Sequence, residues 1–280
     1  MERKNIGPFV KWVGGKRQFL KYINEILPTT FNNYHEPFVG GGAVFFHLLK
    51  NQKINRKAYL NDLNNRLITT YKVVSEEPNK LMKKLDKYQK NSNETFYKDE
   101  RKKIQKYKSD LSIASWFIYV NKAGFNGMYR VNSKGGFNVP YGKNDDKSLY
   151  SKENIISNYN AMKEIELILS SKSFEESFKE IKEGDFVFID PPYDYEPEIK
   201  NGFTRYINPD FKREMQIKLF ELIKEIDKKG AFFLSTNHGT KLIRELYKEF
   251  DITTKKAYRY INSDSTKRKN NAEEVFIKNY

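Results

Sequence analysis

The sequence predicts an α/β fold that is interrupted by one mainly helical segment. Two observations predict it. Between residues 34 and 62 a short strand, three consecutive glycines, a helix and a second strand follow one another, which is the order of a nucleotide-binding α/β unit. Further along, the buried-type strands "DFVFIDPP" and "AFFLSTNH" are separated by the amphipathic helix "REMQIKLFELIKEIDKKG", as in a parallel sheet covered by helices.

The first 63 residues carry the first unit of this alternation. "KWVGGKRQFLKYINEILP" predicts a glycine turn and then a helix that ends at Pro28, because apolar residues recur at helical spacing. "YHEPFVGGGAVFFHLL" predicts a strand, a glycine loop and an apolar helix. "KAYLND" predicts a second strand that ends on Asp62.

The alternation stops between residues 64 and 150. Lys- and Glu-rich helical stretches reach about residue 112, and the segment after "SWFIYV", rich in Gly, Asn and aromatics, predicts loops or a small hairpin. We therefore expect one domain formed by residues 1–63 and 151–280, and an inserted domain at residues 64–150. An insertion without function is the alternative, since surface loops tolerate long insertions. The ending "KAYRYINSDSTKRKNNAEEVFIKNY" predicts two strands around a basic loop.

Charge and composition narrow the class of protein. Lys plus Arg number 51 and Asp plus Glu 36, a net charge of +15, which favours a polyanionic partner. An AT-rich genome would produce the same Lys-rich composition and is the alternative. The absence of cysteine excludes disulfides and thiolate catalysis. Three scattered histidines, His35, His47 and His238, predict no metal site.

Targeting signals are not apparent. No apolar run approaches the roughly 18 residues of a membrane span, and the amino terminus "MERKNIGPFV" lacks the apolar core of a signal peptide. We expect a cytoplasmic protein with no membrane partner.

The stretch "FVFIDPPYDYE" carries the most specific chemistry. Ligands of an open parallel sheet bind outside the carboxyl ends of its strands, which is where Asp190 is delivered. Pro191 and Pro192 form a rigid turn that lacks N–H donors, and Tyr193 adds a flat apolar face. A carboxylate and a carbonyl can accept the two N–H hydrogens of a planar amine that stacks on the tyrosine.

This cradle favours alkyl transfer to nitrogen. An aromatic amine is a poor nucleophile because its lone pair is delocalised into the ring, and two acceptors on its hydrogens favour a pyramidal nitrogen that can attack. A plain capped strand end is the alternative interpretation. Near the amino terminus, Gly40, Gly41 and Gly42 would allow a ligand to approach the backbone. Asp62, 20 residues after Gly42, has the spacing of an acceptor for ribose hydroxyls; the pattern indicates a ligand smaller than a dinucleotide.

These motifs together are similar to a known family. "KWVGGK", "EPFVGGG", "LND", "NGMYRVNSKGGFNVPYGK", "DPPY" and "STNHGT" occur in the order found in the Dam-like DNA adenine N6-methyltransferases of class α, the D12 type. The resemblance implies a Rossmann-like methyltransferase sheet with a C-terminal antiparallel hairpin, interrupted by a target-recognition insertion. It also implies S-adenosylmethionine as methyl donor and duplex DNA as partner.

The resemblance assigns roles residue by residue. The catalytic residues would be Asp190, Pro191, Pro192 and Tyr193. The cofactor site would be lined by Trp12, Lys16, Phe38, Gly40, Gly42, Asp62 and Asp190, with Asp62 on the ribose. Because the methyl group arrives as an activated sulfonium, transfer needs neither a metal nor a covalent enzyme intermediate.

The target adenine must be flipped out of the duplex, which costs a few kcal/mol. Phe125 would fill the gap, with an ordinary core Phe as the alternative. Arg130 would read the guanine that pairs with the last cytosine of GATC, with a phosphate contact as the alternative, and Lys11 the first guanine. The DNA-binding set is Lys11, Phe125, Asn126, Arg130, Asn138, Pro140, Lys143, Lys267 and Arg268. Asn144 departs from the tyrosine of a relative, which leaves the outer base contact open.

The sequence thus predicts an S-adenosylmethionine-dependent adenine N6-methyltransferase of GATC, acting alone or with a cognate restriction endonuclease that forms no stable complex with it. A methyltransferase of cytosine N4, an RNA adenine or a protein amide is the first alternative. A DNA-binding regulator without catalysis is the second, and the intact "DPPY" counts against it.

Overall fold

A computed structural model describes residues 3–143, 148–195, 211–258 and 271–280. The chain divides into two compact units. Unit 1 comprises residues 1–23 and 39–171, and unit 2 comprises residues 24–38 and 172–280. The division into a catalytic domain and a target-recognition domain at residues 63 and 150 stays a prediction, because it concerns function rather than compactness.

The strands form a mixed sheet, which confirms the predicted α/β class. Within the described residues its seven strands follow the order β3-β2-β1-β4-β5-β7-β6. They are β1 (Tyr34–Glu36), β2 (Lys57–Asn61), β3 (Glu166–Ser170), β4 (Phe186–Ile189), β5 (Phe232–His238), β6 (Asp251–Tyr258) and β7 (Asn271–Lys278). The pairs β2–β3, β1–β4 and β4–β5 are parallel. Strand β7 lies antiparallel between β5 and β6, and this confirms the predicted C-terminal hairpin.

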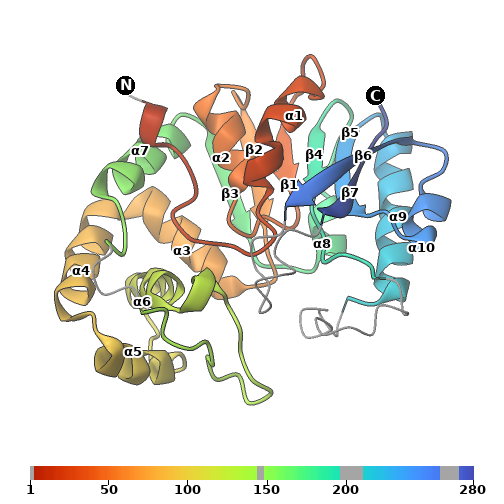
Figure 1. Cartoon of the computed structure of the whole chain (residues 1–280). Helices are drawn as coiled ribbons and strands as arrows, with labels where there is room; N and C mark the ends of the chain where they lie inside the picture. Colours follow the sequence, from red (N-terminus) through yellow and green to blue (C-terminus); the bar gives the residue numbers. More distant parts are fainter. Residues whose placement is uncertain (1–2, 144–147, 196–210, 259–270) are drawn as a thin grey trace. The chain divides into compact units, whose positions relative to one another are not determined.

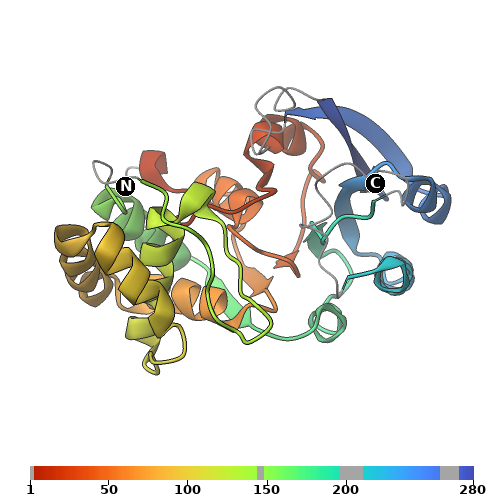
Figure 2. The ribbon, with the colours of Figure 1, turned by 60° about the horizontal axis from the view of Figure 1, so that its bottom comes forward.

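Unit 1 is mostly helical (Figures 1 and 2). Its helices include α2 (Ala43–Lys50), α3 (Asn65–Glu76), α4 (Pro78–Asn91), α5 (Glu94–Glu100), α6 (Asp110–Ala123) and α7 (Lys152–Met162). Short elements of unit 1 are η1 (Arg3–Asn5), η2 (Lys16–Phe19), η3 (Arg101–Lys103) and η4 (Phe125–Gly127). Helix α1 (Leu20–Glu25) begins in unit 1 and ends in unit 2. Side-chain caps start several helices: Asn64, Asn93 and Ser109 each accept a backbone N–H of the following turn.

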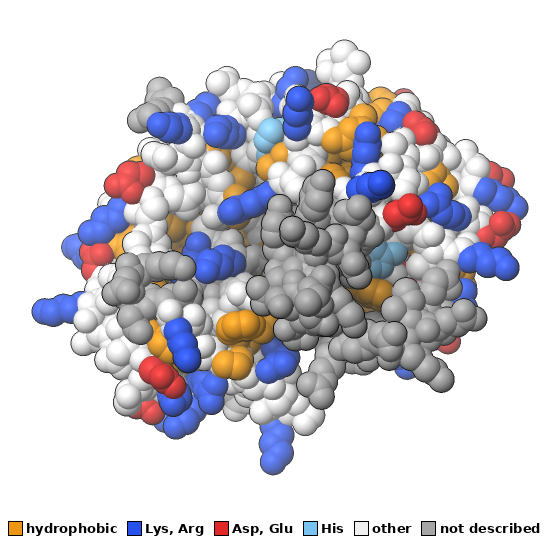
Figure 3. Space-filling model, in the orientation of Figure 1, with side chains coloured by type: hydrophobic (Ala, Val, Ile, Leu, Met, Phe, Trp, Pro, Cys, Tyr) orange, Lys and Arg blue, Asp and Glu red, His pale blue; other side chains and the backbone are white. Residues whose placement is uncertain are grey.

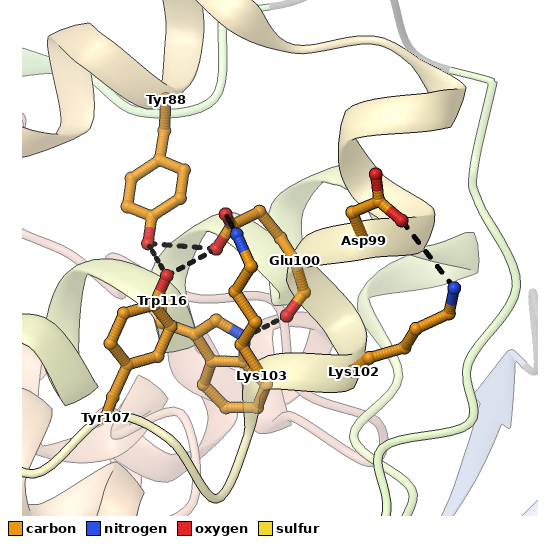
Figure 4. A network of polar contacts seen from close by, with 7 residues as sticks. All are labelled: Tyr88, Asp99, Glu100, Lys102, Lys103, Tyr107 and Trp116. Carbon is orange, nitrogen blue, oxygen red and sulfur yellow. Dashed lines mark hydrogen bonds and ion pairs between the residues drawn. The ribbon is translucent and has the colours of Figure 1, made fainter.

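The inserted segment has a core of its own, built partly on a buried carboxylate (Figure 4). Glu100 is 3% exposed. Its Oε2 accepts hydrogen bonds from the hydroxyls of Tyr107 at 2.7 Å and Tyr88 at 3.3 Å, and its backbone carbonyl accepts one from the Trp116 indole at 2.9 Å. Lys103 supplies the compensating charge 2.5 Å away. A buried carboxylate that is fully bonded fixes the arrangement of the surrounding helices.

Unit 2 packs helices α8 (Phe174–Phe178), α9 (Arg213–Lys228) and α10 (Lys241–Leu246) with strands β4 and β5. All four residues of β4 are buried, as expected of a central strand covered on both faces. Helix α9 presents Leu219, Ile223 and Ile226 to this core. Burying such side chains stabilises the fold by about 1.5–3 kcal/mol each. The core therefore holds rigid the strand ends from which the motif "DPPY" extends.

No helix of the described part of the chain is both long enough and apolar enough to cross a membrane. On the face drawn in Figure 3, Lys and Arg side chains are spread over the surface with acidic side chains between them.

Candidate active site

In unit 1, the glycine loop closes on Trp12. Gly40 (φ +48°) and Gly42 (φ +65°) have left-handed backbones. A Cβ at Gly40 would lie 2.6 Å from the indole nitrogen of Trp12, and one at Gly42 would collide with the Tyr71 hydroxyl. The Trp12 ring is in turn stacked with the rings of Phe117 and Tyr129, at centroid distances of 6.4 and 6.3 Å. Packing inside the protein thus requires these glycines.

Asp62 fastens this loop. It follows β2, as predicted, and its Oδ2 accepts the Gly40 N–H at 3.0 Å while its Oδ1 accepts the Asn64 N–H at 2.9 Å. Desolvation raises the pKa of this half-buried carboxyl, and the two amide bonds oppose the rise. Further donors such as ribose hydroxyls would favour the charged form. The carboxylate therefore fits a ligand that carries ribose hydroxyls.

The other predicted cofactor residues lie in two places. Lys16 is 3% exposed, and its Nζ donates to the Gly14 carbonyl at 2.8 Å in unit 1. Phe38 belongs to unit 2, where its ring packs against those of Phe174 and Phe211 at 5.5 and 5.8 Å. Trp12, Lys16, Gly40, Gly42 and Asp62 are all in unit 1.

In unit 2, Asp190 emerges where β4 ends. The Thr236 hydroxyl of the neighbouring strand β5 donates to its Oδ1 at 2.8 Å. That bond orients the carboxylate and engages one of its oxygens. In the described part of the chain no hydrogen bond to the carbonyl of Pro191 is formed, so this carbonyl is available to a ligand donor beside Asp190.

The rest of the "DPPY" loop is held by a chain of amide contacts. Gln216 of α9 donates to the Pro192 carbonyl at 2.8 Å and accepts from Asn237 at 3.1 Å. Asn237 accepts the Asp194 N–H at 3.0 Å, and the Thr240 hydroxyl donates to the Asp194 carboxylate at 2.6 Å. A loop fastened at so many points is preorganised before any substrate arrives.

The Tyr193 hydroxyl donates to Oε1 of Glu274 on β7. Its ring meets the ring of His238 edge to face, with centroids 4.8 Å apart at 75°. Burial, together with the nearby carboxylates of Asp190 and Glu274, raises the pKa of the Tyr193 hydroxyl well above its ordinary value. The phenol therefore stays protonated and remains a donor to Glu274.

Sequence reasoning missed three residues that position the "DPPY" loop: Thr236, Gln216 and Glu274. The signal that identifies them is burial, which the structure shows and the sequence does not. Each is a polar residue at a buried position, with 0%, 1% and 7% exposure respectively. Buried polar groups need hydrogen-bond partners, so such residues indicate that a polar segment lies next to them.

In unit 1, the fully buried Asn121 of α6 joins two segments of the predicted DNA-binding set. Its side chain accepts the Lys11 N–H at 2.8 Å and donates to the Lys11 carbonyl at 2.9 Å. It also donates to the Gly127 carbonyl at 2.8 Å. The Lys11 side chain is exposed, and its stem occupies the space that a Cβ at Gly127 would need. One buried amide thus fixes where Lys11 and the loop after α6 sit.

Arg130 and Asn138 form a pair in the loop after α6. The Arg130 Nε donates to the Asn138 Oδ1 at 2.7 Å, and Nη2 donates to the Asn138 carbonyl at 3.2 Å. This leaves the outer edge of an exposed guanidinium for a ligand. Phe125 is 47% exposed, which contradicts the alternative of an ordinary core phenylalanine. Its role against DNA stays a prediction.

The remaining predicted DNA residues are less constrained. Asn126 and Lys143 are exposed and have left-handed backbones, with φ of +54° and +53°. The carbonyl of the exposed Pro140 accepts the Phe125 N–H at 2.9 Å. Lys267 and Arg268, like Asn144, lie outside the described residues.

A cation cluster lies beside Lys11. Lys122 of α6 is half-buried, and desolvation followed by repulsion from Lys11 and Arg17 lowers its pKa to about 8. No hydrogen bond or ion pair of its ammonium with a described residue is formed. A half-buried cation beside two exposed cations favours an anionic ligand.

Comparison with known sequences shows which proteins this chain is similar to. Residues 12–261 match the family model described as D12 class N6 adenine-specific DNA methyltransferase. The chain is 37% identical over 281 residues to the type II methyltransferase M1.LlaDCHI of Lactococcus lactis subsp. cremoris, covering 99% of this chain and 96% of that protein. It is 35% identical over 292 residues to the type II methyltransferase M.MjaIII of Methanocaldococcus jannaschii, with 98% and 99% covered. The DNA adenine methylase of Haemophilus influenzae is 31% identical over 272 residues, with 93% and 90% covered.

Proposed function

This chain belongs to the D12 class N6 adenine-specific DNA methyltransferase family, and on that premise we propose that it transfers a methyl group from S-adenosylmethionine to a flipped-out adenine within GATC of duplex DNA. The family membership confirms the resemblance inferred from the motifs. It also removes cytosine N4, RNA and protein amides as targets and a regulator without catalysis, since the family acts on adenine N6 in DNA.

The observation that carries the chemistry is the fastened Asp190. With one oxygen bonded to Thr236, the carboxylate is held where, beside the Pro191 carbonyl, it can accept the N6 hydrogens of adenine. Both acceptors draw the amine toward a pyramidal geometry, and Tyr193 offers the stacking face. Asp190 then takes the proton that the methylated nitrogen loses. S-adenosylmethionine, when bound, supplies the methyl group on a positively charged sulfur.

The donor site that we propose lies in unit 1. Asp62 would accept the ribose hydroxyls, because its desolvated carboxylate gains from added donors. Trp12 and the glycine loop would provide the adjoining surface, with Lys16 beside them. No metal takes part in this scheme.

Sequence recognition is assigned to the DNA-binding set. Arg130, held by Asn138, would present its outer N–H groups to O6 and N7 of guanine, a contact that discriminates by about 1–3 kcal/mol. Lys11 would contact the first guanine, and Phe125 would occupy the space left by the flipped base. Two similar proteins are named type II methyltransferases, so we further propose that the modification protects DNA from a restriction endonuclease of the same specificity.

The test is methylation in a host that lacks adenine methylation. We expect DNA from cells expressing the protein to resist nucleases that cut only unmethylated GATC and to become sensitive to those that cut only methylated GATC. The Asp190→Ala variant, expressed at the same level, should leave the DNA unprotected. If nucleoside mass spectrometry finds N6-methyladenine but cleavage at GATC is unchanged, GATC is rejected as the target sequence and adenine N6-methylation is retained. A wild-type sample free of N6-methyladenine would reject the reaction itself.

A further inference from the structure

A buried carboxylate meets the hydroxyl of the tyrosine in the "DPPY" motif. Glu274 is 7% exposed and accepts the hydrogen bond of the Tyr193 hydroxyl. The two residues are 81 positions apart in the chain. Burying a carboxylate is costly unless it is bonded, so its presence here calls for an explanation beyond packing.

Strand β7 delivers this carboxylate by its place in the sheet. Because β7 runs antiparallel between β5 and β6, Glu274 lies opposite His238 on one side and opposite Lys255 on the other. Directly opposed residues of an antiparallel pair point to the same face. Thr236, two positions before His238, shares that face. The residue that holds Asp190 and the residue that holds Tyr193 thus come from one face of neighbouring strands.

Stacking alone does not require the tyrosine hydroxyl, since a phenylalanine ring offers the same flat surface. The hydroxyl adds two effects when a carboxylate accepts its proton. It fixes the rotation and tilt of the ring, which His238 contacts from the edge. It also enriches the ring in electron density, because the partial negative charge on the phenol oxygen is shared with the π system. An electron-rich face attracts a cation more strongly.

Positive charge develops beside this ring during the proposed reaction. As the N6 lone pair forms its bond to the methyl carbon, the carbon–sulfur bond breaks and the sulfur becomes a neutral thioether. N6 then carries the charge until it passes a proton to Asp190. The attraction of a fixed, electron-rich aromatic face for this charge is stronger in the transition state than in the ground state, which is the condition for accelerating the step.

We propose that Glu274 is a positioning residue for methyl transfer, acting through the Tyr193 hydroxyl to hold and polarise the ring on which the target adenine stacks. This inference rests on the proposed function. It assigns a role in catalysis to the C-terminal hairpin, which the motif "DPPY" by itself does not reveal.

The experiment is a double-mutant cycle on Glu274 and Tyr193. Glu274→Leu removes the acceptor, Glu274→Gln keeps an acceptor without charge, and Tyr193→Phe removes the hydroxyl. We expect Glu274→Leu and Tyr193→Phe each to lower the single-turnover rate about 10-fold, the low end of what a hydrogen bond to a charged group contributes. Glu274→Gln should recover part of the loss, and KM for DNA and donor should stay unchanged. The double variant should be no slower than Tyr193→Phe alone.

Glu273→Gln is the matched control, because it changes the same charge one position away on β7 at a side chain that is 63% exposed. It should leave the rate unchanged. A second readout uses 2-aminopurine at the target position, whose fluorescence in the complex should rise in Glu274→Leu because the base stacks less well. If Glu274→Leu does not fold, the same cycle is run with Glu274→Gln.

Equal losses from the Glu274 variant in the wild-type protein and in the Tyr193→Phe variant would overturn the proposal, as would a folded Glu274→Leu with the wild-type rate. Both results can be obtained only if the wild-type enzyme is active. An inactive wild-type enzyme would reject the proposed function instead, so the two failures can be told apart.

Discussion

At the scale of single residues, Asp62 and Lys122 are ionisable groups whose charged forms are destabilised by burial. Asp62 spends both oxygens on backbone amides and still has a raised pKa because it is desolvated. Lys122 has a lowered pKa beside two other cations. A ligand carrying hydroxyl donors near the first residue, and an anion near the second, would each relieve a cost that folding left in place.

Lys122 gives a pH-dependent prediction. Its folded pKa of about 8 lies below the ordinary value of 10.5, so between these two values the unfolded chain holds more protons than the folded one. The contribution of Lys122 to stability therefore rises as pH rises through this window. We expect Lys122→Met to raise the free energy of unfolding, measured in urea, at pH 7 and to show a smaller gain at pH 9.5.

The exposed Lys87 of α4 serves as the control. Lys87→Met should give the same small difference from wild type at both pH values. An equal gain from Lys122→Met at pH 7 and pH 9.5 would contradict the lowered pKa of Lys122. The substitution removes a desolvation cost and a repulsion that both depend on the charged ammonium, and both diminish as the ammonium loses its proton.

At the scale of secondary structure elements, the sequence predicted those elements whose pattern is local. The strand that ends at Asp62, the strand before Asp190 and helix α9 all occur where periodicity and glycine placed them. Strand β3 was not predicted, because "ELILS" alternates weakly and becomes a strand through its parallel pairing with β2. The positions of Thr236 and Glu274 relative to the "DPPY" loop could not be predicted from the sequence either, because they depend on which strands are neighbours in the sheet.

Helix α6 carries the prediction at this scale. Replacing Asn121 by Ala leaves the N–H and carbonyl of Lys11 and the Gly127 carbonyl without their side-chain partner. A buried group left unbonded costs about 1–3 kcal/mol, so the two segments should shift. We expect Asn121→Ala to reduce the ratio of kcat/KM for a GATC duplex over a duplex with a changed first base pair by about 10-fold, within the range of one lost base contact.

Asn91→Ala, at an exposed asparagine of α4, should leave this ratio unchanged. Melting of both variants shows whether the fold survives. If Asn121→Ala folds and discriminates between the two duplexes as well as the wild type does, Lys11 and the Gly127 loop do not contribute to sequence recognition.

At the scale of the whole molecule, the net charge of +15 admits two explanations, DNA binding and genome composition. Salt dependence distinguishes them. Each phosphate neutralised releases counterions, so a protein that contacts six to ten phosphates loses roughly 10³–10⁵ in affinity between 50 and 200 mM salt. We expect a loss of this size for a GATC duplex by fluorescence anisotropy. Donor binding should change little over the same range, and a flat dependence for DNA would assign the charge to composition.

The place of β7 between β5 and β6 has a consequence for biosynthesis. Among the described strands, β7 supports Tyr193 and is synthesised after β5 and β6, so neither of these can pair with it until residues 271–278 have emerged. Such a late, long-range closure is slow compared with local helix formation. A chain that ends before β7 would therefore keep its amino-terminal helices but lack the carboxylate that bonds the Tyr193 hydroxyl, so we expect such truncated products to methylate DNA more slowly.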